Sequence, residues 1–168
     1  MNNEISLNGT RFLILVAVQV LICNHINFMG YINPYIYILL IILYPTKNNR
    51  AAFIFLSFLL GLTIDLFSDT GGIHAAACVF IAYARPVVLR SSFGVLYENY
   101  AIKFNNVEFG AKLTYITFLT LLHHIILFSL EIFSISKIIL VLQKTLLSSI
   151  FTILLCILIT IIFSRKTR

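Results

Sequence analysis

Long runs of Ile, Leu and Phe, interrupted at fairly regular intervals by short polar segments, constrain this chain more than any other feature. The stretch from Thr145 to Ser164, for example, contains no charged side chain. A helix that crosses the roughly 30 Å hydrocarbon core of a bilayer needs about 20 mainly apolar residues. The apolar runs are continuous rather than alternating, which favours helices over a membrane barrel. The chain is therefore predicted to be an all-α polytopic membrane protein.

The composition agrees with this prediction and indicates one domain. Apolar residues make up 60% of the 168 residues and charged residues only 11%, whereas a soluble domain carries about 25% charged residues. That leaves too little polar surface to cover a water-soluble globule. No shift in composition marks a boundary, so residues 1–168 are predicted to form a single integral-membrane domain without an extramembrane catalytic unit.

Six transmembrane helices are expected. They are Arg11–Ile26, Tyr31–Tyr44, Ala51–Phe67, Ile73–Leu89, Lys112–Leu130 and Ser136–Phe163. The second is short and would have to continue back across Gly30 and Pro34, which neighbouring helices can shelter. The alternative is a five-span protein in which this second run is re-entrant.

The basic residues favour six spans with both termini in the cytoplasm. Cytoplasmic loops carry an excess of Lys and Arg. With six spans, ten of the twelve basic residues lie inside: Arg11, Lys47, Arg50, Arg85, Arg90, Lys103, Lys112, Arg165, Lys166 and Arg168. Only Lys137 and Lys144 fall on the outer side. The long polar interval from Arg90 to Ala111 is expected to be a cytoplasmic loop.

The net charge of +6 does not indicate a nucleic-acid partner, because the basic residues are spread over the loops without a clustered patch. Contact with anionic membrane lipid is the expected secondary role. Cys23, Cys78 and Cys156 are expected to be buried free thiols. The sequence contains no phosphate-binding loop, no H-E-x-x-H and no G-x-S-x-G motif. No enzymatic activity, cofactor or catalytic residue is therefore expected.

One polar constellation interrupts the apolar pattern, in GLTIDLFSDTGGIHAAACVFIAYARP. Gly61, Asp65 and Asp69 follow one another at intervals of four, so they share one helix face. A carboxylate within a span is costly unless it faces the bundle interior or water. Asp65 is therefore expected to face inward, at the outer end of the third helix.

The second half of the constellation predicts a tight turn into the next helix. Gly71 and Gly72 tolerate positive φ, and Asp69 with Thr70 resembles an N-cap. His74 and Arg85 share the face of Cys78, and Arg85 lies at the cytoplasmic end. Alanines between them provide small surfaces for close helix packing.

Four interpretations of this hairpin remain open. Asp65 and His74 could form a buried hydrogen bond that fixes the hairpin register, or the hairpin could form a binding surface for another membrane protein. A small-molecule or proton pathway is a third possibility. A metal site is the least supported, because three candidate ligands lack a repeated His or Cys spacing.

Other polar residues within spans are expected to have structural roles. Adjacent helical residues point about 100° apart, so one of His123 and His124 should face the bundle while the other reaches a neighbour or an interface. Lys144 should reach the interface or pair with Glu131 or Asp65. The tyrosine pairs Tyr35/Tyr37 and Tyr97/Tyr100 are expected to be interface anchors and packing residues.

The pattern Gly-x-x-x-Asp, followed by a Gly-Gly-x-His turn into an alanine-rich helix, resembles the bacterial rod shape-determining protein MreD family. Gly61, Asp65, Gly71, Gly72 and His74 carry this pattern, and AAACVFIAYARP follows it. The chain length, the run NPYIYILLIILYP and the small basic C-terminus also resemble that family, particularly its Bacteroidetes-like forms.

The resemblance implies a non-catalytic scaffold of the cell-elongation machinery in the bacterial cytoplasmic membrane. The implied partners are an MreC-like bitopic protein and, more distantly, MreB, RodA and a class B penicillin-binding transpeptidase. The implied fold is a six-helix bundle similar to the substrate-binding subunit of energy-coupling-factor transporters. The expected partner-binding or structural hairpin comprises Gly61, Asp65, Asp69, Gly71, Gly72, His74 and Arg85.

Two other functional classes are alternatives to the scaffold. A vitamin-binding subunit of an energy-coupling-factor-type transporter would need a ligand pocket near the outer face, where these polar groups also lie. A proton-coupled carrier would depend on Asp65, His74 and His123. The carboxylates, however, cluster at one end of the spans rather than at the midplane, where carriers usually bind their substrates.

Overall fold

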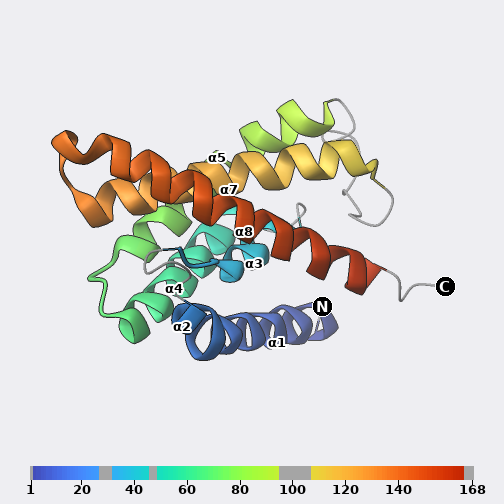
Figure 1. Ribbon diagram of the computed structural model, residues 1–168. Coiled ribbons are helices and arrows are strands. Elements are labelled where there is room, and N and C mark those ends of the chain that lie inside the picture. The colour runs from blue at the N-terminus through green and yellow to red at the C-terminus, as the bar shows by residue number, and fades with distance from the viewer. Residues whose placement is uncertain (1, 27–31, 46–48, 95–106, 165–168) are drawn as a thin grey trace.

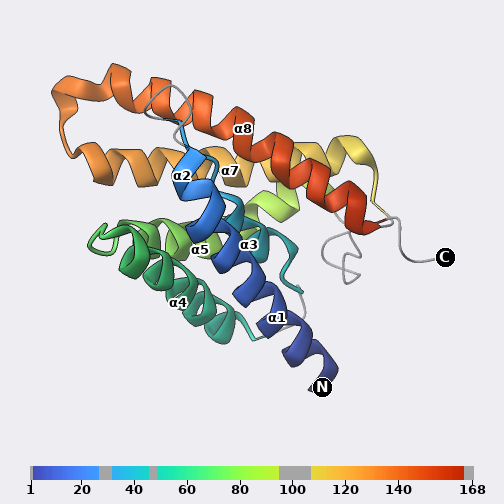
Figure 2. The same ribbon diagram turned by 60° about the horizontal axis from the view of Figure 1, so that its bottom comes forward.

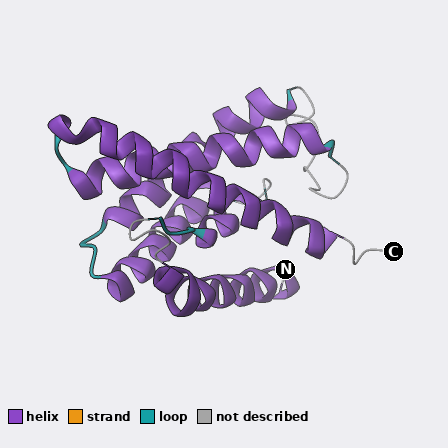
Figure 3. Ribbon diagram, in the orientation of Figure 1, coloured by secondary structure: helices purple, strands orange, loops and turns teal. Residues whose placement is uncertain are grey.

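The computed structural model describes residues 2–26, 32–45, 49–94 and 107–164, and these form an all-helical fold (Figure 3). Five helices are long and apolar enough to cross a membrane: Asn8–Ile26, Arg50–Ser68, Ile73–Phe93, Phe109–Ile132 and Ile135–Ile162. The prediction of an all-α protein is confirmed in this part of the chain. The five helices indicate a multi-pass membrane protein.

The helices agree in order with the expected ones, and most are longer. The first is α1 (Asn2–Val18), a π-helical turn η1 (Gln19–Cys23) and α2 (Asn24–Ile26). A 3-10 turn η2 (Ile36–Ile38) and α3 (Leu39–Leu43) follow, and then α4 (Arg50–Ser68) and α5 (Ile73–Phe93). The last elements are α7 (Phe109–Ile132), the 3-10 turn η4 (Ile135–Lys137) and α8 (Ile138–Ser164). Most of the expected loop from Arg90 to Ala111 lies outside the described residues.

The last four long helices, α4, α5, α7 and α8, are sequential antiparallel neighbours. Helix α4 packs on α5, α5 on α7, and α7 on α8, while α1 crosses beside α4 (Figures 1 and 2). The α4–α5 and α7–α8 connections lie together at one end of the bundle, and the start of α1 and the end of α8 lie at the other (Figure 1). A hydrogen bond from Asn24 Nδ2 to Ser68 Oγ (3.0 Å) ties the ends of α2 and α4 together.

The second expected span, Tyr31–Tyr44, differs most from its prediction. Of its described residues, 32–44, only Ile36–Leu43 is helical, and residues 32–35 are irregular. Pro34 gives the physical reason, because its ring disfavours helical backbone in the preceding residue and it has no N–H to donate. The segment lies at the centre of the bundle, where every residue from Tyr35 to Ile42 is buried. We refer to residues 32–44 as the central segment.

The central segment extends from one end of the bundle towards the other. Near its start, Tyr37 contacts His74 in the first turn of α5. Near its end, the carbonyl of Tyr44 accepts from Arg85, three turns further along α5. This segment therefore runs beside α5 through the interior.

Helices α4 and α5 approach each other so closely at Gly61 that no side chain fits there. A Cβ atom at Gly61 would lie 2.4 Å from Ala75 Cα and 2.5 Å from the carbonyl oxygen of His74. Both contacts are to backbone, which cannot rotate away. Glycine at position 61 thus sets the distance between the two helices.

Gly61→Ala should therefore destabilise the protein by roughly 1–3 kcal/mol, the usual cost of overpacking, or more because α5 must move away as a unit. The matched control is Gly9→Ala in α1, where a Cβ meets nothing within 4 Å. Thermal unfolding in mild detergent measures both variants. Equal midpoints for the Gly61 and Gly9 variants would contradict the close approach of the two helices.

Candidate functional site

The carboxylate of Asp65 accepts three hydrogen bonds at the α4–α5 turn. Oδ1 accepts from the Thr70 hydroxyl (2.5 Å) and the backbone N–H of His74 (3.0 Å), and Oδ2 accepts from the backbone N–H of Ala75 (2.8 Å). His74 and Ala75 are in the first turn of α5, whose N–H groups have no partner within the helix. A negative charge there is also favoured by the helix dipole. Asp65 thus caps α5 from the preceding helix.

This arrangement corrects two details of the sequence prediction. The expected bond between Asp65 and His74 exists, but the backbone of His74 makes it rather than the imidazole. Asp69 was expected as the N-cap of α5, and that prediction is wrong. Asp69 has a φ of 52° and ends α4, while the cap residue Gly72 (φ 100°) makes no side-chain capping bond. Asp69 is exposed, because its carboxylate is not needed once Asp65 occupies the helix terminus.

The imidazole of His74 instead belongs to a second network, centred on Tyr37. The Tyr37 hydroxyl lies 2.7 Å from His74 Nδ1 and 2.9 Å from His123 Nε2. Since a hydroxyl carries one proton, it donates to one imidazole and accepts from the other. All three side chains are at most 5% exposed. The central segment is thereby fastened to α5 and α7 at once.

His124 faces a different neighbour, as the 100° separation from His123 predicts. Its Nδ1 donates to the carbonyl of Thr120 (2.8 Å), which fixes the proton on that nitrogen, and its Nε2 lies 3.2 Å from Thr152 Oγ1 on α8. Thr152 Oγ1 also accepts from the backbone N–H of Tyr35 (3.0 Å). The two histidines therefore link α7 to the central segment and to α8.

Gln19, in the π-helical turn of α1, completes the start of the central segment. Its Oε1 accepts from the N–H of Ile36 (2.8 Å), and its Nε2 donates to the carbonyl of Pro34 (3.1 Å) and to Asn24 (2.9 Å). Gln19 is fully buried. A π-turn changes the direction of the side chains that follow a regular helix. In this protein the π-turn begins at Gln19, whose side chain bonds to the irregular backbone at Pro34 and Ile36.

Arg85 hydrogen-bonds the backbone at the other end of the central segment. Its Nη2 donates to the carbonyls of Ile42 (3.3 Å) and Tyr44, and its Nε donates to the Tyr115 hydroxyl (2.8 Å). Within the described residues Arg85 meets no carboxylate and lies over the ring of Phe53. The negative end of α3 and these carbonyls therefore hold the guanidinium.

The two glycines of the α4–α5 turn have positive φ: 63° at Gly71 and 100° at Gly72. A Cβ atom at either position would meet no atom within 4 Å. Glycine is therefore needed there for the backbone conformation and not for space.

Other polar residues predicted within the spans have partners or are buried. Lys144 Nζ pairs with Glu131 (2.8 Å), which was one of the two predicted acidic partners. Tyr35 and Tyr37 are not interface anchors but core residues. Tyr97 and Tyr100 lie outside the described residues.

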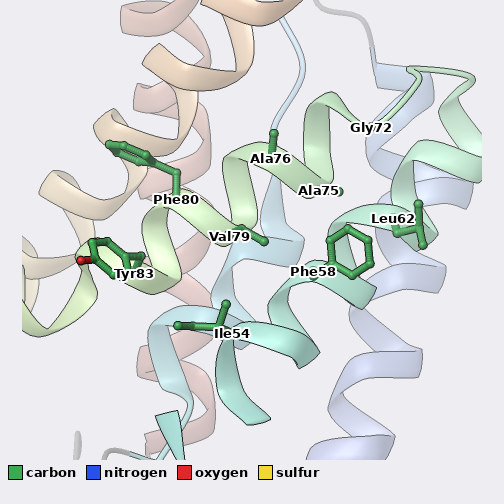
Figure 4. Close-up of a pocket in the computed structure, with 9 residues that line it drawn as sticks. All are labelled: Ile54, Phe58, Leu62, Gly72, Ala75, Ala76, Val79, Phe80 and Tyr83. Carbon is green, nitrogen blue, oxygen red and sulfur yellow. The ribbon is translucent and has the colours of Figure 1, made fainter. Parts of the chain in front are cut away.

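An apolar groove lies on the opposite side of the hairpin from these networks, between α4 and α5. Its volume is about 590 Å³, and its lining residues are Ile54, Phe58, Leu62, Gly72, Ala75, Ala76, Val79, Phe80 and Tyr83. In Figure 4 the α4 residues form one side, Phe80 and Tyr83 the other, and the small residues of α5 lie between them. The groove presents almost no polar atoms.

The networks and the groove differ in what they can do chemically. Asp69 is exposed, and His123 Nδ1 is buried without a partner among the described residues. The carboxylate of Asp65, the imidazoles of His74 and His124, Gln19 and Arg85 all bond to backbone or to another side chain of the protein, which is a structural use. In the described ranges no group of three or more His, Cys, Asp and Glu side chains comes together as a metal site. The groove is the part of the hairpin that is open to another molecule.

Tyr37→Phe tests the central network, because it removes the hydroxyl and leaves two buried imidazole nitrogens without their partner. We expect a loss of about 1–3 kcal/mol in stability, the usual cost of an unsatisfied buried polar group. Tyr83→Phe is the control, since that ring is 66% exposed. Thermal unfolding of the two detergent-solubilised variants makes the comparison, and an unchanged midpoint for Tyr37→Phe would refute the network.

No protein-family model, curated protein sequence or solved structure matches this chain. The resemblance to the MreD family therefore stays a prediction from the sequence.

Proposed function

We propose that this protein is a non-catalytic scaffold of a bacterial cell-elongation machinery in the cytoplasmic membrane, with its α4–α5 groove receiving the transmembrane helix of an MreC-like bitopic partner. MreB, RodA and a class B penicillin-binding transpeptidase are the further proposed members of that assembly. The observation that carries the proposal is the groove, because it is apolar, elongated and floored by small residues.

The shape and chemistry of the groove suit a helix. From Gly72 to Tyr83 its α5 wall extends for about 16 Å at 1.5 Å per residue, or three helical turns. Gly72, Ala75, Ala76 and Val79 recur at the spacing of one helix face. Small residues in this pattern let two helix backbones approach closely within a membrane. The aromatic rims of Phe58 and Phe80 would contact both sides of the incoming helix.

A six-crossing topology with both termini in the cytoplasm forms part of the proposal. The central segment would provide the second crossing, since it connects the end of α2 to the start of α4 at the opposite end of the bundle. Irregular backbone at membrane depth is tolerated where protein surrounds it, and here it is buried and hydrogen-bonded. Arg11, Arg50, Arg85, Arg90 and Lys112 then lie towards the inner end, and Lys137 and Lys144 towards the outer end. This distribution follows the positive-inside rule.

The vitamin-transporter alternative has less support from the geometry. A small-molecule site needs a cavity with a few convergent polar groups. At the outer end of this bundle the Tyr37 hydroxyl bonds to the imidazoles of His74 and His123. These side chains are buried together with Tyr35 and fill the interior there. We propose that the chain shares the six-crossing arrangement of energy-coupling-factor substrate-binding subunits. We do not propose that it shares their ligand binding.

Photo-crosslinking in cells tests the scaffold proposal. A photoreactive phenylalanine analogue at Phe80, which is 44% exposed in the groove, should crosslink to a protein that has one transmembrane helix and a large outer part. The same analogue at Ile150, a 55% exposed position on α8, should not. Mass spectrometry identifies the adduct. Crosslinks only to lipid at both positions would contradict the proposal, and a vitamin-sized molecule co-purifying with the chain would favour the transporter.

Ala76→Trp should reduce recovery of that partner at least fivefold, because the indole would fill the floor of the groove. Val87→Trp is the matched control on the same helix, since Val87 is exposed but does not line the groove. Ala76 is a sharper choice than Gly72, where positive φ means that any side chain also strains the turn. Cells in which the Ala76 variant replaces the native protein should lose rod shape. Normal recovery and shape would refute the proposed docking site.

A further inference from the structure

A second crevice lies at the other end of the bundle, between the start of α7 and the end of α8. Its volume is about 180 Å³, and it is lined by Phe109, Lys112, Leu113, Ile116, Ile157, Thr160 and Ile161. Leu113, Ile116, Ile157 and Ile161 make the lining mainly apolar. The Thr160 hydroxyl donates to the carbonyl of Cys156 (2.6 Å). Lys112 is therefore the group that offers a polar contact to a ligand.

Lys112 is a cation without a described counter-ion. The ion pair in the described part of the chain joins Lys144 and Glu131, at the opposite end of the same two helices. The side chain of Lys112 is half-buried, so its methylene groups lie along the crevice while the ammonium can reach its rim. An ammonium that has no counter-ion among the described residues and lies beside an apolar crevice is complementary to a ligand with an anionic head and an apolar tail.

The register of α7 and α8 places Lys112 at the C-terminal end of α8. The pairs Glu131–Lys144 and His124–Thr152 set this antiparallel register. Continued along both helices, it places Lys112 level with the end of α8 near Ser164. In the six-crossing topology proposed above, that end lies at the inner leaflet, whose anionic lipids attract basic residues.

We propose that this crevice binds an anionic glycerophospholipid of the inner leaflet. An acyl chain occupies the apolar part between Leu113 and Ile157, and the Lys112 ammonium pairs with the lipid phosphate. This site is separate from the α4–α5 groove, so it does not depend on the partner proposed above. It would fasten the α7–α8 hairpin, which contributes to the core through His123, His124 and Thr152, to the cytoplasmic membrane surface.

Native mass spectrometry of the full-length protein tests this site, with palmitoyl-oleoyl phosphatidylglycerol and the matching phosphatidylcholine as probes. We expect phosphatidylglycerol to be retained in preference to phosphatidylcholine. Lys112→Gln should lower its retention at least threefold, whereas Lys137→Gln, an exposed lysine at the other end of the bundle, should leave it unchanged. Equal retention of the two lipids, or no effect of Lys112→Gln, would overturn the proposal.

Two further arms separate the crevice from surface charge and a lipid from free phosphate. Leu113→Trp fills the apolar part while Lys112 is kept, so it should also lower phosphatidylglycerol retention at least threefold. Retention that falls with Lys112→Gln alone would mean attraction to a charged surface and would overturn the site. Inorganic phosphate at matched concentration should not displace the lipid, and displacement would show a phosphate site instead. Size-exclusion profiles before and after heating verify that each variant is folded.

Discussion

The backbone of the central segment must find hydrogen-bond partners inside the protein, and the rest of the structure depends on this requirement. At membrane depth no water is present to satisfy a broken helix, and each unsatisfied group costs several kcal/mol. Three distant side chains meet the need: Gln19 from η1, Thr152 from α8 and Arg85 from α5. Because they come from three helices, the central segment cannot be satisfied unless those helices are already packed around it. The irregular centre therefore specifies the arrangement of the bundle rather than weakening it.

The polar residues Asp65 and His74 of the α4–α5 hairpin likewise bond to groups inside the protein. Asp65 uses its carboxylate on backbone N–H groups, and His74 uses its imidazole on Tyr37. Such groups are costly in a membrane when they are unpaired, yet they contribute stability and register when every partner is present. A carboxylate with three donors is poorly placed to act as a base or to carry a proton. The arrangement supports a structural role for these residues and leaves binding to the apolar groove beside them.

The sequence predicts the helices well because continuous apolar runs are a local signal. It predicts that Asp65 faces inward because a carboxylate within a span is costly elsewhere, and the helical spacing of His74 and Arg85 predicts that they share a face. It does not predict the central network. Tyr35 and Thr152 are 117 positions apart, and a single Gln19 or Tyr37 within an apolar run looks like an interfacial residue until its partner is known. The position of Asp69 and Thr70 just before the turn favours them as the cap of α5. Asp65 caps it instead, because the close approach at Gly61 brings the last turns of α4 beside the first turn of α5.

Ala75 is the residue at which the two sides of the hairpin meet. Its N–H donates to Asp65, its Cα is the atom that a Cβ at position 61 would meet first, and it lines the groove. The carboxylate on the buried side therefore fixes the position of the groove floor without contacting any molecule within the groove. A change at Asp65 would alter the proposed docking site by moving α5, whereas a change at Ala76 would occupy the space of the groove itself. These two routes differ in their effect on stability, because only the first leaves buried N–H groups without acceptors. The Asp65 carboxylate thus fixes the position of α5. The small residues Gly72, Ala75 and Ala76 leave the space of the groove unfilled.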